Sequence, residues 1–232
     1  MPLFDARMAV LKDRLADSRS GRVLFVAHCL LNENTRYPGG AFCPGVMPGV
    51  ADLISGLDAG LVQVICPERV AWGGVDKRLV YGFMGLGRAP GMGAVSRLAF
   101  PLAWRLLNAR MGWVARYTAA EIRDYLKNGM QVLGYVGVGG SPSCGVNHAP
   151  DVAKYFEWFA KTDPGRVTRE EQNEVLARTT VPGRGVFIER LKKCLGPDAD
   201  RVPFLEHDLL AEMAGKPATL ARDLRIAMGR GK

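Results

Sequence analysis

The run Val23-Leu24-Phe25-Val26-Ala27-His28-Cys29 is a short apolar stretch that ends in a cysteine. Two later runs end in the same way, LVQVIC at residues 61–66 and VLGYVGVGGSPSC at residues 132–144. Short apolar runs bounded by Gly and Pro predict β-strands. In an open parallel sheet the carboxyl ends of the strands share one edge, and ligands bind in the crevice outside it. We therefore expect Cys29, Cys66 and Cys144 to meet at one edge of a parallel sheet.

Helical patterns alternate with these strands. A charged amphipathic helix over residues 1–17 precedes the first strand, and a helix near residues 50–59 precedes the second. Thr118, as N-cap, and Glu121, three residues later, form a capping box that predicts the start of a helix before the third strand. We expect further helices over residues 151–161, 185–195 and 205–228, the last with a break at 215–217. This alternation predicts an α/β fold, a single domain over residues 1–232 with a Rossmann-like parallel sheet flanked by helices.

Composition supports one globular domain. The chain has 232 residues, of which 48% are hydrophobic and 23% are charged, and this is enough to bury an ordinary core. It has five cysteines, no secretory signal pattern and no charge-free apolar stretch as long as a membrane-spanning helix. We therefore expect a protein of the reducing cytoplasm without a transmembrane segment. Cysteines in that compartment more often bind metals or act in catalysis than form disulfides.

The segment 76–117 is rich in basic and aromatic residues, and we interpret it as an insertion. The chain has a net charge of +8, and the eight basic residues from Arg69 to Arg116 stand beside a single acid, Asp76. Mixed cationic and aromatic groups are typical of elements that bind nucleic acids or membrane surfaces. They are also typical of an amphipathic element whose apolar side packs on the core. We favour a lid or packing element, with binding to the backbone of tRNA as the alternative.

Three converging thiolates suit an iron–sulfur cluster in which one iron has no protein ligand, because soft sulfur ligands select Fe–S centres, Zn and Cu(I). A zinc site completed by His28 or His148 is an alternative, although the closely spaced ligand pairs of structural zinc sites are missing. A nucleophile formed by Cys144 and His148 lacks a third group to orient it. The sequence contains no phosphate-binding loop and no C-x-x-C pair, and Pro142 interrupts the dinucleotide-binding pattern that begins at Gly137.

Several short strings resemble motifs of the thiouracil desulfurase (TudS) family. They are His28-Cys29-Leu30-Leu31-Asn32, Arg36-Tyr37-Pro38-Gly39-Gly40, Cys66-Pro67-Glu68 followed by Gly73-Gly74, and Ser141-Pro142-Ser143-Cys144-Gly145. Pro182-Gly183-Arg184-Gly185-Val186-Phe187 resembles an additional motif of a longer branch of that family. The resemblance spans most of residues 22–195. It implies that Cys29, Cys66 and Cys144 hold a [4Fe–4S] cluster whose fourth iron takes sulfur from a thiocarbonyl substrate.

The residues around the cysteines include candidates for proton transfer and for substrate binding. Shorter members of the family tend to have an aspartate where this chain has Pro38, so a carboxylate is missing there. Proton transfer at an open iron needs a nearby acid–base group, and Glu68 is the first candidate. Ser141 and Ser143 are candidates for catalysis or substrate contact, and the structural alternative is that they cap the next helix. The candidate substrate-binding residues are His28, Asn32, Arg36 and Arg184, each of which has a structural alternative within its own loop.

The combined hypothesis is a desulfidase that works without net redox change. An open iron would act as Lewis acid on a thiouracil-like small molecule, water would attack the thiocarbonyl carbon, and hydrosulfide would leave. One alternative is removal of sulfur from a thiolated base in tRNA, and another is a cluster-binding or zinc-binding regulatory module without enzymatic activity. Cys43 and Cys194 do not follow a predicted strand, so we do not expect them to be ligands.

Overall fold

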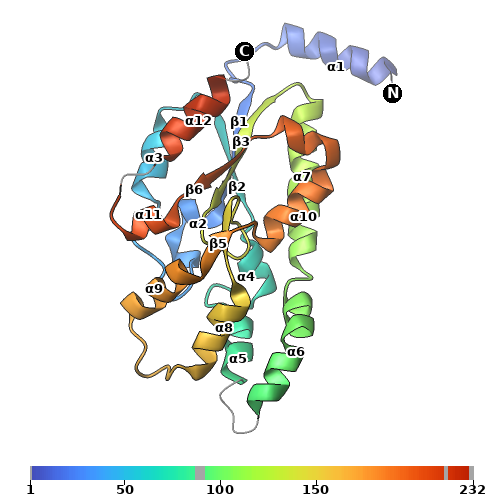
Figure 1. Cartoon of the computed structure of the whole chain (residues 1–232). Helices are drawn as coiled ribbons and strands as arrows, with labels where there is room; N and C mark the ends of the chain where they lie inside the picture. Colours follow the sequence, from blue (N-terminus) through green and yellow to red (C-terminus); the bar gives the residue numbers. More distant parts are fainter. Residues whose placement is uncertain (1, 87–91, 217–218, 230–232) are drawn as a thin grey trace.

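The computed structural model describes residues 2–86, 92–216 and 219–229. A four-stranded parallel sheet in the order β2-β1-β3-β6 lies at the centre (Figure 1). Its strands are β1 (Arg22–Ala27), β2 (Gly60–Val64), β3 (Gln131–Val138) and β6 (Phe204–His207). A separate antiparallel pair is formed by β4 (His148–Pro150) and β5 (Thr180–Pro182). The predicted α/β fold with a Rossmann-like parallel sheet is confirmed.

Helices cover both faces of the sheet (Figure 1). On one face lie α4 (Pro67–Ala71), α7 (Met111–Lys127) and α10 (Val186–Leu195). On the other face lie α2 (His28–Leu31), α3 (Pro48–Ser55), α11 (Leu209–Met213) and α12 (Leu220–Gly229). The remaining helices are α1 (Pro2–Arg14), α5 (Arg78–Leu86), α6 (Met92–Leu107), α8 (Val152–Lys161) and α9 (Arg169–Thr179), with short 3-10 turns at η1 (Glu33–Thr35) and η2 (Gly196–Arg201).

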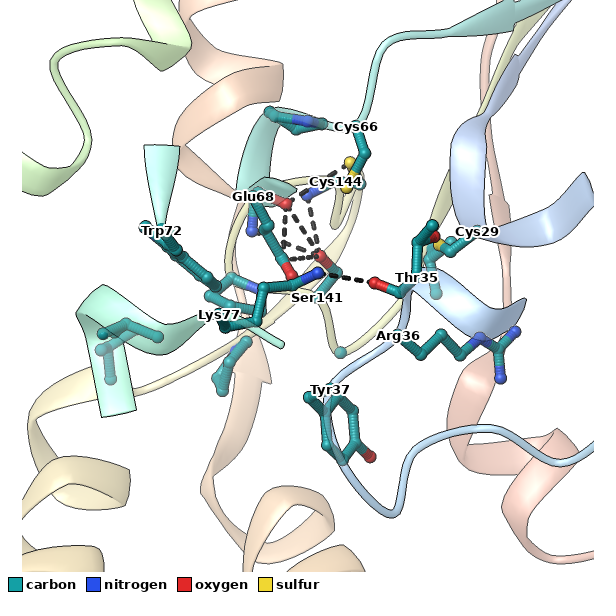
Figure 2. A pocket seen from close by; sticks show the side chains of 18 of the residues that line it. Cys29, Thr35, Arg36, Tyr37, Cys66, Glu68, Trp72, Lys77, Ser141 and Cys144 are labelled. Atoms are coloured by element: carbon teal, nitrogen blue, oxygen red, sulfur yellow. Dashed lines mark hydrogen bonds between the residues drawn. The ribbon is translucent and has the colours of Figure 1, made fainter. Parts of the chain in front are cut away.

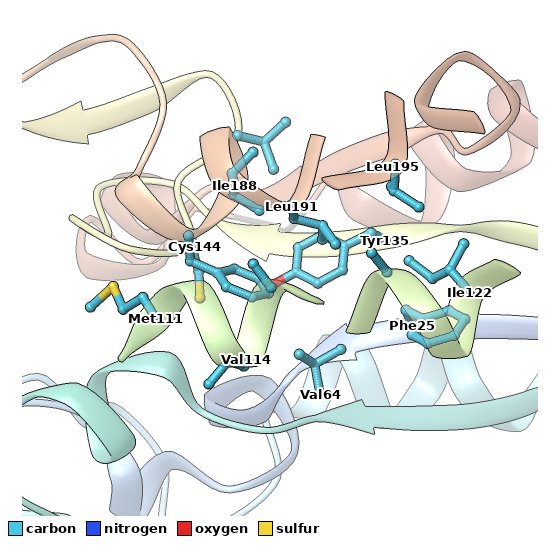
Figure 3. Close-up of a cluster of buried hydrophobic side chains, with 14 of the residues drawn as sticks. Phe25, Val64, Met111, Val114, Ile122, Tyr135, Cys144, Ile188, Leu191 and Leu195 are labelled. Carbon is cyan, nitrogen blue, oxygen red and sulfur yellow. The ribbon is translucent and has the colours of Figure 1, made fainter. Parts of the chain in front are cut away.

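The composition of β1 shows why the central strands are continuous apolar runs. Side chains alternate along a strand, so Val23 and Phe25 pack in one core cluster, whereas Leu24 and Val26 pack in the other. Figure 3 shows the first cluster, in which Phe25 lies among side chains of α7 and α10. Helices cover both faces of the sheet, so both sets of strand residues must be apolar.

The strand order creates a crevice at the carboxyl end of β1. This strand pairs with β2 along one edge and with β3 along the other. It therefore stands where the order of the strands reverses, and open α/β sheets bind ligands outside such a point. Cys29 follows β1, Cys66 follows β2 and Cys144 follows β3. The predicted position of the three cysteines beyond strand ends is confirmed.

The helix before β3 starts earlier than the capping box predicted. It begins at Met111, and Thr118 lies buried within it rather than at its N-cap. Met111, Val114, Ala115 and Thr118 are all buried at helical spacing, and this packing extends the helix toward its N-terminus. The segment 76–117 therefore does not end at a helix boundary, because it contains α5, α6 and the first turns of α7.

The C-terminal region contains a strand that the helical prediction over residues 205–228 missed. Residues 204–207 form β6, which pairs with β3, and this pairing overrides the local preference of the segment. Glu206 Oε2 accepts hydrogen bonds from the backbone N–H groups of Val146, Asn147 and His148 (2.7, 2.6 and 3.1 Å), so β6 also holds the chain just after Cys144. The expected break is observed between α11 and α12.

The first helix differs from the sequence prediction, and part of the basic segment is not described by the structure. α1 is charged and exposed, but its apolar residues do not gather on one face, so it is not amphipathic. Arg88 of the basic segment lies outside the described residues, and so does the side chain of Arg97. Across the described parts of the chain, no helix combines the length and apolar character needed to cross a membrane.

The loop that carries Cys144 is fixed against the start of α10. The N–H of Gly185 donates to the carbonyl oxygen of Gly145 (2.9 Å), which brings the two backbones into close contact. A Cβ atom at position 185 would overlap the carbonyl group of Ser143, whereas nothing lies within 4 Å of a Cβ atom built at Gly183. The absence of a side chain is therefore required at position 185 and not at position 183.

Gly185→Ala should destabilise the protein by roughly 1–3 kcal/mol, the range for overpacked sites, because the added methyl group must displace the backbone of the Cys144 loop. Gly183→Ala is the matched control and should change the free energy of unfolding by no more than about 0.5 kcal/mol. Urea unfolding followed by circular dichroism measures both values. Equal stability of the two variants would contradict the close packing described here.

Candidate functional site

A cavity of about 100 Å³ opens at the carboxyl edge of the sheet (Figure 2). A single buried water needs roughly 10–15 Å³, so the cavity has room for a small ligand. Cys29, Cys66 and Cys144 all line it, as the sequence predicted. The other predicted residues in its wall are His28, Arg36, Glu68, Ser141 and Ser143.

Burial keeps the three thiols protonated. It raises the pKa of Cys29 to about 12 and also raises the pKa of Cys66. Burial, and next the neighbouring Cys29, raise the pKa of Cys144 well above its ordinary value. A cysteine binds a metal as the thiolate, so metal binding at this site must release protons. The affinity for a metal therefore increases as the pH rises toward these pKa values.

A single zinc ion fits the three cysteines poorly. Zn–S bonds of about 2.3 Å in a tetrahedron place two sulfur atoms about 3.8 Å apart. Among the described residues, the sulfur atoms of Cys29, Cys66 and Cys144 do not all lie within 4.8 Å of one another. His148 does not line the cavity, and its Nδ1 lies 2.9 Å from Glu206 Oε1. The three sulfur atoms as placed are therefore not arranged around one zinc ion.

Polar groups surround the sulfur atoms in a way that suits thiolates. The N–H of Arg69 donates to Cys66 Sγ (3.4 Å). Ser143 Oγ also lies 3.4 Å from Cys144 Sγ, but it donates its single proton to Glu68. The buried hydroxyl of Tyr135 has no hydrogen-bond partner among the described residues. Burial, and next the adjacent Cys144, raise the pKa of Tyr135 well above its ordinary value. A thiolate at Cys144 would accept a hydrogen bond from this hydroxyl, and such bonds orient metal-bound thiolates.

Glu68 is held by the two serines of the Cys144 loop. Its Oε1 lies 3.2 Å from Ser141 Oγ and 2.7 Å from Ser143 Oγ, and both hydroxyls donate to it. Ser141 Oγ accepts a hydrogen bond from the N–H of Cys144 (3.0 Å), which orients this hydroxyl toward the carboxylate. Figure 2 shows this network beside the sulfur atoms of Cys66 and Cys144. The structure thus brings together the three residues that the sequence proposed for catalysis.

Arg36 lines the cavity, but its guanidinium binds protein groups. Nη2 lies 3.1 Å from Glu33 Oε1, and Nη1 lies 3.1 Å from Glu212 Oε2 and 3.2 Å from the carbonyl oxygen of Gly40. Its charge also acts on Cys29, where it lowers the pKa of the thiol against the larger effect of burial. This arrangement anchors the loop of Arg36 to α11. Because its guanidinium N–H groups already bind protein oxygens, few of them are available to a substrate. Glu33, Cys43 and Glu212 are also close enough to hold a metal ion, yet Arg36 already pairs with both carboxylates.

The other predicted substrate-binding residues divide into two groups. His28 lies in the cavity wall, and burial, followed by the charge of Arg69, lowers the pKa of its imidazole. Asn32 and Arg184 do not line the cavity. Asn32 Oδ1 accepts a hydrogen bond from Asn34 Nδ2 (3.0 Å), and Arg184 is exposed. Among these three residues, His28 alone is positioned to contact a ligand in the cavity.

Lys77 is a cavity residue that the sequence did not single out. It is only 1% exposed, and its Nζ donates to the carbonyl oxygens of Thr35 (2.6 Å) and Val75 (3.3 Å). None of the described ion pairs includes it. Burial is the main cause that raises the pKa of Cys66, and Lys77 acts in the opposite direction by favouring the thiolate. Its position among the basic residues of segment 76–117 is the one signal that the sequence offered.

Aromatic side chains form the outer part of the cavity wall. They are Tyr37, Trp72, Tyr81, Trp104 and Tyr155. Trp72 Nε1 donates to Asn108 Oδ1 (3.1 Å) and Tyr37 Oη donates to Asn173 Oδ1 (2.9 Å), so both rings are fixed. Fixed aromatic rings suit a flat heterocyclic ligand. Tyr81 and Trp104 belong to α5 and α6, so the segment 76–117 forms part of the wall, which agrees with the lid interpretation.

Comparison with known proteins adds no further indication of function. No protein-family model matches the chain, and neither does any curated protein or solved structure. The resemblance to the thiouracil desulfurase family therefore rests on the short motifs alone. Function has to be inferred from the chemistry of the cavity.

Lys77→Met should slow alkylation of Cys66 by iodoacetamide several-fold at alkaline pH. The cation favours the Cys66 thiolate, so its removal raises the pKa of Cys66 further and lowers the thiolate fraction at a given pH. Arg78→Met is the matched control, because Arg78 is exposed and pairs with Asp76 outside the cavity. Mass spectrometry of the alkylated peptide measures the rates. An unchanged rate in Lys77→Met would show that Lys77 does not act on the thiols.

Proposed function

We propose that Cys29, Cys66 and Cys144 hold a [4Fe–4S] cluster and that the protein removes sulfur from a thiouracil-like small molecule. The observation that supports this most is Glu68, a carboxylate held by two serines in the same cavity as three cysteines from three strand ends. The net reaction is hydrolytic, because a thiocarbonyl group and water give a carbonyl group and hydrogen sulfide without consuming electrons. When bound, the cluster would supply a Lewis-acidic iron with an affinity for soft sulfur.

Glu68 is positioned to move protons in this reaction. Both serine hydroxyls bind its Oε1, and no hydrogen bond to Oε2 is found among the described residues, so Oε2 is available to a water in the cavity. A carboxylate in this place can take a proton from the attacking water and return it to the leaving sulfur. Ser141 and Ser143 hold the carboxylate in one orientation, so the proton is transferred at a fixed point beside the cysteines.

The remaining wall of the cavity suits the proposed substrate class. Trp72 and Tyr81 offer ring faces or edges to a flat thiolated base. The ammonium group of Lys77 favours the negative charge that develops on oxygen and sulfur when water adds to a thiocarbonyl carbon. These groups bind and orient the substrate, whereas Glu68 transfers the proton.

The position of the basic side chains favours a free small molecule over tRNA. The cavity of about 100 Å³, bounded partly by α5 and α6, has room for a base-sized group. Arg105, Arg110 and Arg116, which would have to bind a polynucleotide backbone, are exposed and do not line the cavity. A regulatory module without enzymatic activity would give no role to the carboxylate and serines beside the cysteines.

Each of the single changes Cys29→Ser, Cys66→Ser and Cys144→Ser should remove most of the cluster, because a hydroxyl is a poor substitute for a thiolate at iron. The controls are Cys43→Ser and Cys194→Ser. Neither side chain lines the cavity, so both variants should retain the cluster. Iron and acid-labile sulfide per chain, measured after anaerobic reconstitution, give the occupancy. Loss of iron in either control, or full iron in any of the three variants, would refute the ligand set.

Glu68→Gln should retain the cluster and slow sulfide release from a thiouracil by roughly 10²–10⁴-fold, the contribution of a positioned acid–base group. The amide keeps the shape of the side chain, and the serine hydroxyls can still bind its oxygen. Sulfide is measured anaerobically with and without reductant, and the parent protein should need none. Full activity in Glu68→Gln would move proton transfer to another residue, and a strict need for reductant would exclude the hydrolytic reaction.

A further inference from the structure

The outward face of α6 exposes a row of leucines. Leu98, Leu102 and Leu106 are 87%, 63% and 65% exposed. They are one helical turn apart, so they lie on the same face. Trp104 and Leu107 lie on the opposite face and pack against the core. A helix that is apolar on both faces is normally covered on both, so the outer face of α6 requires a partner.

Two more exposed apolar side chains lie in the first turns of α7, which begins shortly after α6 ends. Trp113 and Tyr117 are 50% and 52% exposed, and their rings stack with centroids 5.8 Å apart. In Figure 1 α6 and α5 form the end of the molecule opposite α1, and the leucine row of α6 is not covered by another part of the described chain. We name the leucine row of α6 together with Trp113 and Tyr117 the α6 surface. Several large exposed apolar side chains on successive helices are typical of interaction sites.

The segment that carries the α6 surface is strongly basic, and its first acid after Asp76 is Glu121, one helical turn beyond Tyr117. The sequence from Lys77 to Ala120 contains seven Lys and Arg residues and no Asp or Glu. Arg105, Arg110 and Arg116 are exposed along α6 and α7, beside the apolar side chains. Long basic side chains beside apolar residues can extend to a negatively charged surface while the apolar residues are buried.

Three kinds of partner differ in how well they fit both the apolar and the basic side chains of the α6 surface. A second copy of the chain would bring two basic segments together without an acid between them, which is unfavourable. A polynucleotide would bind the arginines but would leave the leucines exposed to water. An anionic lipid surface satisfies both, because leucine, tryptophan and tyrosine enter the boundary between headgroups and acyl chains while arginines bind the headgroups.

We propose that the α6 surface docks the protein on an anionic lipid bilayer, with α6 lying in the plane of the headgroups. This inference is independent of the chemistry in the cavity. The parent protein should bind vesicles of phosphatidylcholine mixed with phosphatidylglycerol, and it should bind vesicles of phosphatidylcholine alone much more weakly. Binding should also fall as salt rises, because screening weakens the attraction between the arginines and the lipids.

Two sets of variants test the contribution of each part. The triple change Leu98→Ser, Leu102→Ser and Leu106→Ser should weaken vesicle binding about 100-fold, since three leucines no longer enter the bilayer. Replacing Arg105, Arg110 or Arg116 by Gln should each weaken vesicle binding about fivefold at low salt. The control is Val46→Ser with Val181→Ser, two exposed apolar residues in other parts of the chain, and it should bind as the parent does.

Co-sedimentation with vesicles measures binding, and circular dichroism confirms that each variant is folded. Absence of binding to the anionic vesicles, or equal binding by the leucine variant, would overturn the proposal. A dimer in sedimentation velocity that the leucine changes dissociate would assign the α6 surface to a second copy and also overturn it. Tight, salt-dependent binding of tRNA without vesicle binding would assign the surface to a polynucleotide instead.

Discussion

The candidate site depends on the burial of β1. This strand is paired on both edges, and its residues from Leu24 to Ala27 are buried on both faces. A shift of register by one residue would exchange the two sets of apolar side chains, so the register is strongly specified. β2 and β3 are aligned by the same pairing. Cys29, Cys66 and Cys144 are thus brought to one edge by backbone hydrogen bonds, without needing contacts among themselves.

The cavity combines groups that are unfavourable in an apolar environment. Burial is the largest cause that raises the pKa of Cys29 and Cys144, and the buried Lys77 is held by carbonyl oxygens rather than by a carboxylate. Buried polar groups without full compensation are costly, and this cost is common at functional sites. A negatively charged group bound by the cysteines would lie near the Lys77 cation, and the Cys144 thiolate would accept a hydrogen bond from the Tyr135 hydroxyl. Such a ligand therefore also stabilises the fold.

The sequence predicted the parts of the structure that local patterns determine. β1 and β3 are buried on both faces, so they are continuous apolar runs, and the cysteines beyond the strand ends follow from that pattern. β6 could not be predicted, because its Glu206 and His207 resemble surface residues and its place is set by pairing with β3. Lys77 belongs to the basic segment of the sequence, where an exposed side chain is expected because lysine is almost always exposed. Only the folded chain shows that two carbonyl groups hold it inside the cavity.

The loop of Cys144 depends on parts of the chain that the ribosome makes late. The loop is bound to Gly185 at the start of α10, and Glu206 of β6 holds the residues that follow the cysteine. Contacts between segments distant in sequence form only after both have been synthesised. The edge that presents Cys29 beside Cys144 is therefore complete only after Glu206 has joined the sheet. A metal centre at this edge would have to be inserted after that step, and not while only the first three strands are folded.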